Sequence, residues 1–245
     1  MNEPTQVDET IYVQQIERDG YSIVENVISR DDVRVLIDAV AALPIGDEIR
    51  RKRSTYGVRN LLEICPEVRK LAASAPIRSL VTPILGDDCF AARAIFFDKT
   101  PDANWKLGWH QDSVISVRER IEVSGFVGWS QKAGVRQVQP PAEVLANMLA
   151  IRVHLDESHA DNGPLRVLPG SHKFGWLDDE IDAWKRNVAE VVCQVSVGGV
   201  VAMHPLLIHA SSASVEPTHR RVIHIEFAAE ELPGGLEWNQ RVRPS

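Results

Sequence analysis

MLAIRVHLD, at residues 148–156, changes between apolar and polar side chains with a period of two. On an extended chain, one face of this segment would carry only aliphatic side chains, those of Leu149, Ile151, Val153 and Leu155. The opposite face would carry Arg152 and His154. This alternation predicts a β-strand that separates an apolar layer from a more polar space.

Further short segments on both sides of this strand are rich in β-branched and aromatic residues and are bounded by Gly, Pro, Asn or Asp. They are ARAIFFDK (92–99), PLRVLPG (164–170), EVVCQVSV (190–197), GVVAMHPLLIHA (199–210) and RRVIHIEFAA (220–229). Several short strands joined by loops predict a β-sandwich or barrel, and we expect a jelly roll.

The chain before residue 89 has the periodicity of helices. SRDDVRVLIDAVAAL (29–43) is the clearest case, because Ser29 suits the N-cap, acidic residues follow it, and Pro44 ends the pattern. We expect further helices at about 8–20, 65–74 and 75–86. The basic segment RRKRSTYGVRN (50–60) is predicted to be a solvated surface loop.

These patterns predict a single domain over residues 1–245, mainly β with α. Its parts would be a mostly helical layer at about 1–88, a jelly-roll core at about 89–230 and a C-terminal tail at 231–245. The long connection near 113–146 is expected to form a lid, because loops of that length often cover functional sites.

Composition excludes several classes of protein. The 27 basic and 34 acidic residues give a net charge of −7, which is not typical of a nucleic-acid or anionic-membrane binder. No apolar run approaches the roughly 20 residues that cross a bilayer. The polar, acidic start and three widely spaced cysteines, Cys65, Cys89 and Cys193, favour a cytoplasmic protein with free thiols.

WHQD, at residues 109–112, is the strongest local signal of chemistry. On a strand, His110 and Asp112 would point to the same side and could offer a nitrogen and an oxygen to one metal ion. HPLLIHASS (204–212) supplies a third ligand in His209, followed by small residues that allow close approach. Two His and one carboxylate suit a non-haem Fe(II) oxygenase, and they also suit Zn²⁺ with one open position.

Arg220 follows His209 by eleven residues. The short connection between their segments favours antiparallel neighbouring strands, which would place Arg220 beside the strand of His209. Its guanidinium could then hold a carboxylate with two parallel hydrogen bonds, or it could simply face solvent beside Arg221. His224 and Glu226 would share the face of Arg220, either towards solvent or towards a barrel interior.

His204 is the main rival of His209 as a ligand. The two residues are five positions apart, so on a regular strand they face opposite ways and only one can point at the metal. His172, in NGPLRVLPGSHK (162–173), is interpreted as part of a turn-rich scaffold.

In this order, the motifs WHQD, NGPLRVLPGSHK, HPLLIHASS and the arginine eleven residues on resemble the phytanoyl-CoA dioxygenase family of Fe(II)/2-oxoglutarate-dependent oxygenases. The resemblance covers roughly residues 10 to 230. It implies a double-stranded β-helix core, jelly-roll or cupin-like, with the helical layer packed on one sheet.

The same resemblance implies the roles of individual residues. Fe(II) would be held by His110, Asp112 and His209, and O₂ would react there. The cosubstrate 2-oxoglutarate would contact Gln111 and Ser211, and its C5 carboxylate would bind Arg220. Arg152 stands where some relatives carry a large aromatic residue, so it would bind either 2-oxoglutarate or an anionic group of the substrate.

The function implied is hydroxylation of an unactivated C–H bond with release of succinate and CO₂; desaturation and ring formation use the same oxidant. The presence of Asp112 disfavours halogenation, because related halogenases carry a small residue there. Two alternatives stay open: a metal-dependent hydrolase or isomerase on a cupin-like barrel, and a non-catalytic jelly-roll binding protein.

The sequence does not identify the substrate beyond a small molecule, nor the oligomeric state. Phe97, Trp109 and Trp129 are candidates for its apolar contacts. The net negative charge argues mildly against a strongly anionic partner such as CoA, although a local pocket can oppose the global sign.

Overall fold

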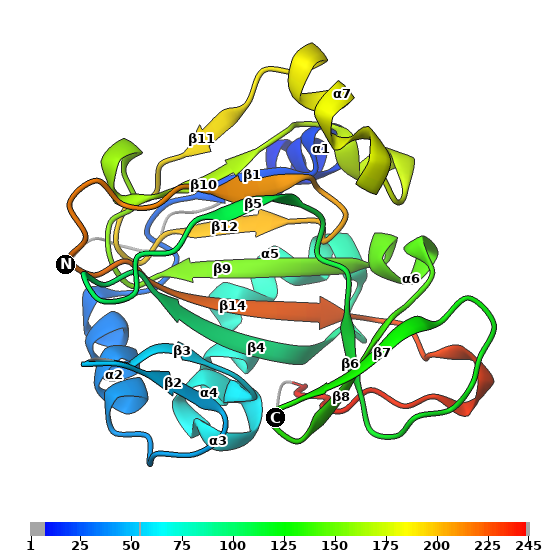
Figure 1. Cartoon of the computed structure of the whole chain (residues 1–245), viewed down its shortest axis with the longest axis horizontal. Helices are drawn as coiled ribbons and strands as arrows, with labels where there is room; N and C mark the ends of the chain where they lie inside the picture. The colour runs from blue at the N-terminus through cyan, green and yellow to red at the C-terminus, as the bar shows by residue number, and fades with distance from the viewer. Residues whose placement is uncertain (1–7, 54, 244–245) are drawn as a thin grey trace.

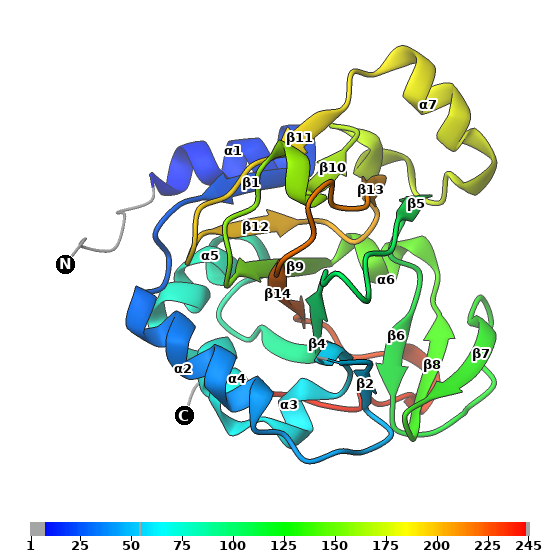
Figure 2. The ribbon, with the colours of Figure 1, turned by 60° about the vertical axis from the view of Figure 1, so that its left-hand side comes forward.

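The computed structural model describes residues 8–53 and 55–243. Its centre is a pair of antiparallel β-sheets whose inner faces pack together, with helices outside the larger sheet (Figures 1 and 2). The inner contact joins Leu165 and Val167 of the smaller sheet to Val201 and Met203 of the larger one. The expected double-stranded β-helix core is confirmed. In the described residues, no strand of one sheet pairs with a strand of the other.

The larger sheet has seven antiparallel strands in the order β1-β12-β9-β14-β4-β3-β2. The alternating segment MLAIRVHLD forms the interior strand β9, as predicted, which pairs with β12 and β14. The bounds are β1 (Tyr21–Val24), β12 (Val200–Met203), β9 (Met148–His154), β14 (Arg221–Ala228), β4 (Phe90–Asp98), β3 (Thr55–Val58) and β2 (Ile49–Arg51).

The smaller sheet has four strands in the order β11-β10-β13-β5, also antiparallel. Their bounds are β11 (Val191–Cys193), β10 (Leu165–Val167), β13 (His209–Ser211) and β5 (Leu107–His110). The prediction of one strand over 199–210 was wrong. A turn at 204–208, closed by the Leu207 N–H donating to the His204 carbonyl at 3.0 Å, carries the chain from one sheet to the other.

The predicted helical layer covers the outer face of the larger sheet, where Ile151 and Ile223 pack among its apolar side chains. Ser29 caps its helix in a reciprocal arrangement with Asp32, as the sequence indicated for the N-cap. The helices of this layer are α1 (Glu9–Asp19), α2 (Arg30–Ala41), α3 (Leu61–Ile64), α4 (Pro66–Ala73) and α5 (Ala75–Leu85).

The segment predicted as a basic surface loop is a β-hairpin. Strands β2 and β3 pair with each other, and β3 continues the larger sheet by pairing Gly57 with Phe97 and Val58 with Phe96 of β4. The loop prediction was wrong because the charged residues conceal Val58, which is fully buried. A partner strand from elsewhere in the chain supplies the pairing.

The long insert after Asp112 is ordered as a third sheet, β6-β8-β7, followed by helix α6 (Figure 2). It packs on a second apolar cluster that includes Phe90 and Trp238, so residues near the C-terminus fold back onto the core. The bounds are β6 (Ile115–Val117), β8 (Val135–Gln139), β7 (Val127–Lys132) and α6 (Ala142–Ala146).

The remaining elements are short. They are helix α7 (Ile181–Asn187) and the 3₁₀ turns η1 (Ala160–Asn162), η2 (Ser171–Phe174), η3 (Asp178–Glu180) and η4 (Pro233–Gly235). Within the described residues, every helix is too short or too polar to cross a membrane.

Candidate functional site

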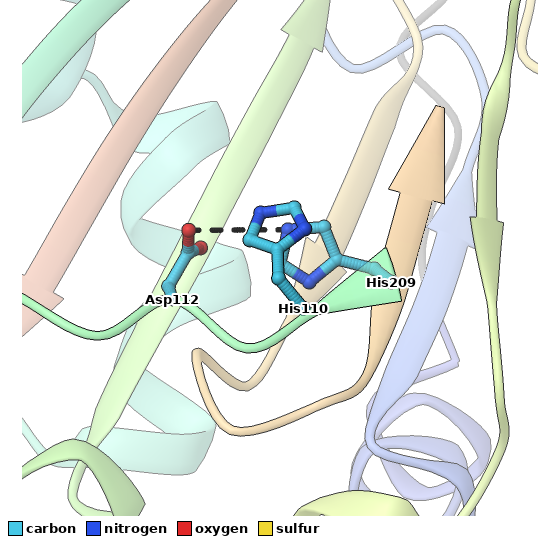
Figure 3. Close-up of side chains that lie close together, drawn as sticks. All are labelled: His110, Asp112 and His209. Carbon is cyan, nitrogen blue, oxygen red and sulfur yellow. Dashed lines mark ion pairs between the residues drawn. The ribbon is translucent and has the colours of Figure 1, made fainter. Parts of the chain in front are cut away.

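His110 and His209 lie opposite each other on the paired strands β5 and β13, as direct Cα partners in the register. Their ring centroids are 4.2 Å apart. Asp112 follows the end of β5, where its backbone N–H donates to the Pro205 carbonyl at 2.9 Å. One ligand atom from each of the three residues lies within 4.8 Å of the others (Figure 3). Strand pairing and one turn therefore assemble a three-ligand set.

Both imidazoles are oriented by the backbone. Nδ1 of His110 lies 2.8 Å from the Gly108 carbonyl, and Nδ1 of His209 lies 2.8 Å from the Leu207 carbonyl. A carbonyl only accepts, so each Nδ1 carries a proton, and in this tautomer of the neutral ring Nε2 is the nitrogen that can coordinate a metal. Burial lowers the pKa of His209 to about 3, which leaves this ring neutral and able to coordinate.

Asp112 supplies the charge of the set. Its Oδ1 lies 3.9 Å from Nε2 of His209, and its Oδ2 is buried with no hydrogen-bond partner in the described residues. Burial raises the pKa of this carboxyl, but the surrounding His209, His224 and His110 rings and Arg152 outweigh it, so that the pKa falls to about 2. An ionised, buried and unpartnered oxygen beside two free imidazole nitrogens fits a divalent metal ion.

Gln111 lies between the two ligands of the WHQD motif, and its amide makes three hydrogen bonds inside the protein. Its Nε2 donates to the carbonyls of Gly175 (2.8 Å) and Leu206 (2.6 Å), and its Oε1 accepts from the Leu177 backbone N–H (2.8 Å). Gln111 also lines the cavity in front of the ligands, so its contact with 2-oxoglutarate stays a prediction, and these bonds give it a positioning role as well. The amide ties the turn before β13 to the end of β5, which fixes the distance between the ligands.

A cavity of about 320 Å³ opens in front of the three ligands and is lined by both sheets. Arg220 and Arg152 lie on its wall and are 3% and 7% exposed. Arg220 donates from Nη1 to the Gly163 carbonyl at 2.7 Å, while its Nε has no partner among the described residues. Burial, together with Arg152, lowers the pKa of Arg220 to about 9. Two buried guanidiniums without a carboxylate partner in the described chain fit an anionic ligand.

Arg220 does not reach this cavity through the expected strand pairing. Strand β13 pairs with β10 and β5, whereas β14 pairs with β9 and β4. The prediction of neighbouring strands was wrong because the connection 212–220 crosses from one sheet to the other. Arg220 consequently faces the strand of His209 across the space between the sheets.

A chain of polar contacts behind Asp112 was only partly predicted from the sequence. Nε2 of His224 lies 3.4 Å from Glu226, whose carboxylate accepts from Arg93 at 3.0 Å, and Nδ1 of His224 contacts Arg152 at 3.1 Å. The sequence indicated that His224 and Glu226 share a face with Arg220, and the structure turns that face inward. Arg93 was missed, although it has the same parity on its strand as Ile95 and Phe97, which line the cavity.

The other predicted contact residues separate into two groups. Ser211 and Phe97 line the cavity. Trp109 instead packs beside Leu168 under the guanidinium of Arg166, 5.1 Å from its ring. Trp129 packs on the cluster of the insert, with Arg120 5.4 Å from its ring. Neither tryptophan is a lining residue, because each is used to pack its own strand.

His204 lies outside the three-ligand set. Its ring stacks on that of His172 at 4.9 Å between centroids, and burial lowers its pKa to about 4. His172 also contacts Gly20 at the end of α1, which agrees with its interpretation as scaffold. The geometry therefore brings His209, and not His204, to His110 and Asp112.

Comparison with known proteins gives one family. The family model described as phytanoyl-CoA dioxygenase matches residues 16–222. The ectoine dioxygenase of Sphingopyxis alaskensis is 28% identical over 258 residues, which cover 90% of this chain and 77% of that protein. The L-proline trans-4-hydroxylase of Streptomyces griseoviridis is 23% identical over 245 residues, which cover 86% of this chain and 82% of that protein.

Solved structures have the same fold. The crystal structure of EctD from S. alaskensis with bound Fe superposes with a TM-score of 0.72 at 19% identity, and covers 100% of this chain and 89% of that one. The structure of EctD with 2-oxoglutarate and 5-hydroxyectoine gives a TM-score of 0.68 at 20% identity, and covers 94% of this chain and 78% of that one.

Proposed function

Because this chain belongs to the phytanoyl-CoA dioxygenase family, we propose that His110, Asp112 and His209 hold Fe(II) beside a bound 2-oxoglutarate. The chain is an Fe(II)- and 2-oxoglutarate-dependent oxygenase, and hydroxylation of a small molecule is the reaction we propose for it. One observation carries the assignment of residues. Two backbone-oriented imidazoles and an ionised carboxylate with an unpartnered oxygen converge within 4.8 Å.

The chain's own groups provide binding and orientation. When bound, iron and 2-oxoglutarate together supply the oxidising chemistry, with succinate and CO₂ as by-products. The rings of His110 and His209 present Nε2, and Asp112 offsets part of the metal's charge. The surrounding sheets bury His209 and the Oδ2 atom of Asp112, which limits the access of bulk water to the ligand atoms.

We assign the far carboxylate of 2-oxoglutarate to Arg220. Its guanidinium is buried, has an unpartnered Nε in the described chain and lies on the cavity wall with Ser211. Arg152 lies on the same wall and adds a second positive charge, held in place by its contact with His224. A dicarboxylate fits such a site better than the single water of a metal-dependent hydrolase does, because the two buried charges need an anionic partner.

A cytoplasmic location is proposed as well. All three cysteines are free and buried, as expected in a reducing compartment.

Succinate formation tests the proposal. Purified protein with Fe(II), ascorbate and 2-oxoglutarate should release succinate in the presence of members of a small-molecule panel, and Asp112→Ala and His209→Ala should abolish that release. His159→Asn is the matched control, because His159 is an exposed histidine whose capping contact asparagine can replace. Full activity of Asp112→Ala, or activity with Zn²⁺ but not Fe(II), would contradict the assignment.

A further inference from the structure

A second cavity, of about 570 Å³, adjoins the first one. The two share the wall residues Arg59, Ile95, Phe97 and Trp105, so the space in front of the metal ligands continues outward. The outer wall is formed by the β2–β3 hairpin, by β4 and by residues 101–105. A cavity of this size accommodates a small molecule.

The charges around this outer space are strongly unbalanced. Arg50 of β2 and Arg59, directly after β3, line it, and Lys132 of the insert lies with Arg59 on the wall of the inner cavity, where the two cavities join. In the described residues, none of these three cations forms an ion pair. The nearby carboxylates are already used, since Asp102 lies 3.7 Å from Arg53 and Glu226 is paired with Arg93.

The three cations also repel one another. Burial lowers the pKa of Arg59, and Arg50 and Arg93 lower it further. The pKa of Lys132 falls for the same reasons, with Arg59, Arg93 and Arg50 as the charges. Like charges held together at a cavity wall without counter-charges cost stability unless an anion binds there.

The same space has an aromatic side. Phe97 stands at the junction of the two cavities, and Tyr56 and Trp105 pack against each other with ring centroids 6.0 Å apart. Aromatic walls bury the apolar body of a ligand, while the cations fix its polar end.

We propose that the outer cavity binds the primary substrate, and that this substrate carries a carboxylate or phosphate held by Arg59 with Lys132 and Arg50, and an apolar body on Phe97, Tyr56 and Trp105. The identification of the ligand as the substrate rests on the proposed function, whereas the anion site is inferred from the cavity itself. The site is separate from that of 2-oxoglutarate, because Arg152 and Arg220 line only the inner cavity. The local charge thus opposes the net charge of −7.

Isothermal titration calorimetry on protein saturated with Mn(II) and 2-oxoglutarate tests the proposal. The probes are 3-phenylpropionate, 2-phenylethyl phosphate and the neutral 3-phenylpropanamide. At least one anion should bind at least about tenfold more tightly than the amide, which corresponds to about 1.4 kcal/mol. The tighter of the two anions identifies the group as carboxylate or phosphate.

Substitutions in the walls of the two cavities identify the residues that bind the anion. Arg59→Met and Lys132→Met should each weaken its binding about tenfold, and Arg59→Lys should retain most of it. Arg69→Met is the matched control, because Arg69 is exposed on α4, makes no ion pair in the described residues and lines neither cavity. Circular dichroism and melting temperature verify that each variant folds.

Equal binding of anion and amide, absence of anion binding, or unchanged affinity in both methionine variants would overturn the inference. The succinate assay separates this result from the proposed function. Succinate release without Arg59-dependent anion binding refutes the outer site alone. Arg59-dependent binding without succinate release refutes the oxygenase and leaves an anion-binding cavity.

Discussion

His110 and His209 are Cα partners across β5 and β13, and each ring is held by a 2.8 Å contact between Nδ1 and the carbonyl two residues before it. The two Nε2 lone pairs are therefore directed towards the same space by backbone geometry alone. A site ordered in this way loses little conformational entropy when an ion binds.

Metal binding should stabilise the fold through this pair. At a free Mn(II) concentration of 100 times its dissociation constant, the free energy of unfolding should rise by about 2.7 kcal/mol. Denaturant unfolding with and without Mn(II) measures the effect, and EDTA should reverse it. Asp112→Ala should remove the stabilisation, and an equal gain in that variant would show that the ion binds elsewhere.

Gln111→Leu should show that Gln111 positions the metal ligands without being a ligand itself. The change leaves two carbonyls and one N–H without their partner, which should lower the free energy of unfolding by about 2–4 kcal/mol. Because the amide holds β5 to the turn before β13, Mn(II) affinity should fall as well, although no ligand is removed. Unchanged Mn(II) affinity in a folded variant would contradict the positioning role.

Arg220→Met should raise the KM for 2-oxoglutarate roughly ten- to hundredfold, because the charge-assisted hydrogen bonds to one carboxylate are lost. Arg220→Lys should recover part of the loss, since lysine keeps the charge but not the planar fork. Succinate release at varied 2-oxoglutarate measures both. A KM unaffected by either change would move the dicarboxylate to Arg152.

Gly163→Ala should destabilise the protein by more than about 2 kcal/mol. Gly163 has φ +71°, and an added Cβ would press against the Ser212 carbonyl oxygen. Its own carbonyl accepts from Arg220, so 2-oxoglutarate binding should weaken together with stability. Gly170→Ala is a comparison at φ +82° in the same left-handed region, where the new Cβ would meet only an ordinary van der Waals contact with the Arg18 carbonyl oxygen, and it should cost less.

His154→Leu should stabilise the protein, increasingly at acid pH. His154 is fully buried with both ring nitrogens unpartnered in the described residues, and burial, with Arg152 and Arg220, holds its pKa well below 6.5. Below pH 6.5 the unfolded chain takes up a proton that the folded chain refuses, so wild-type stability falls as pH falls. At pH 7 the variant should gain about 1 kcal/mol from the removal of unsatisfied nitrogens.

Urea unfolding of both proteins between pH 5 and 8 measures the difference. A gain that is independent of pH would indicate that the folded protein does accept a proton at His154.

The sequence by itself determined the elements whose signals are local. Alternation fixed the faces of β9 and β14, and capping side chains fixed the start of α2. Local spacing also brought His110 and Asp112 to one side, because only one residue separates them. These features depend on backbone geometry over a few residues, so no distant partner is needed to predict them.

Only the tertiary structure decided what depends on partners far along the chain. It placed the 204–208 turn between two sheets, put Arg220 across from His209 instead of beside it, and used the Gln111 amide for three backbone bonds. It also made β2, β3 and Arg59 of the basic segment 50–60 a cavity wall, because pairing of β3 with β4 outweighs the local preference of charged residues for solvent. Register and sheet assignment come from such non-local contacts, whose energy no short segment of sequence carries.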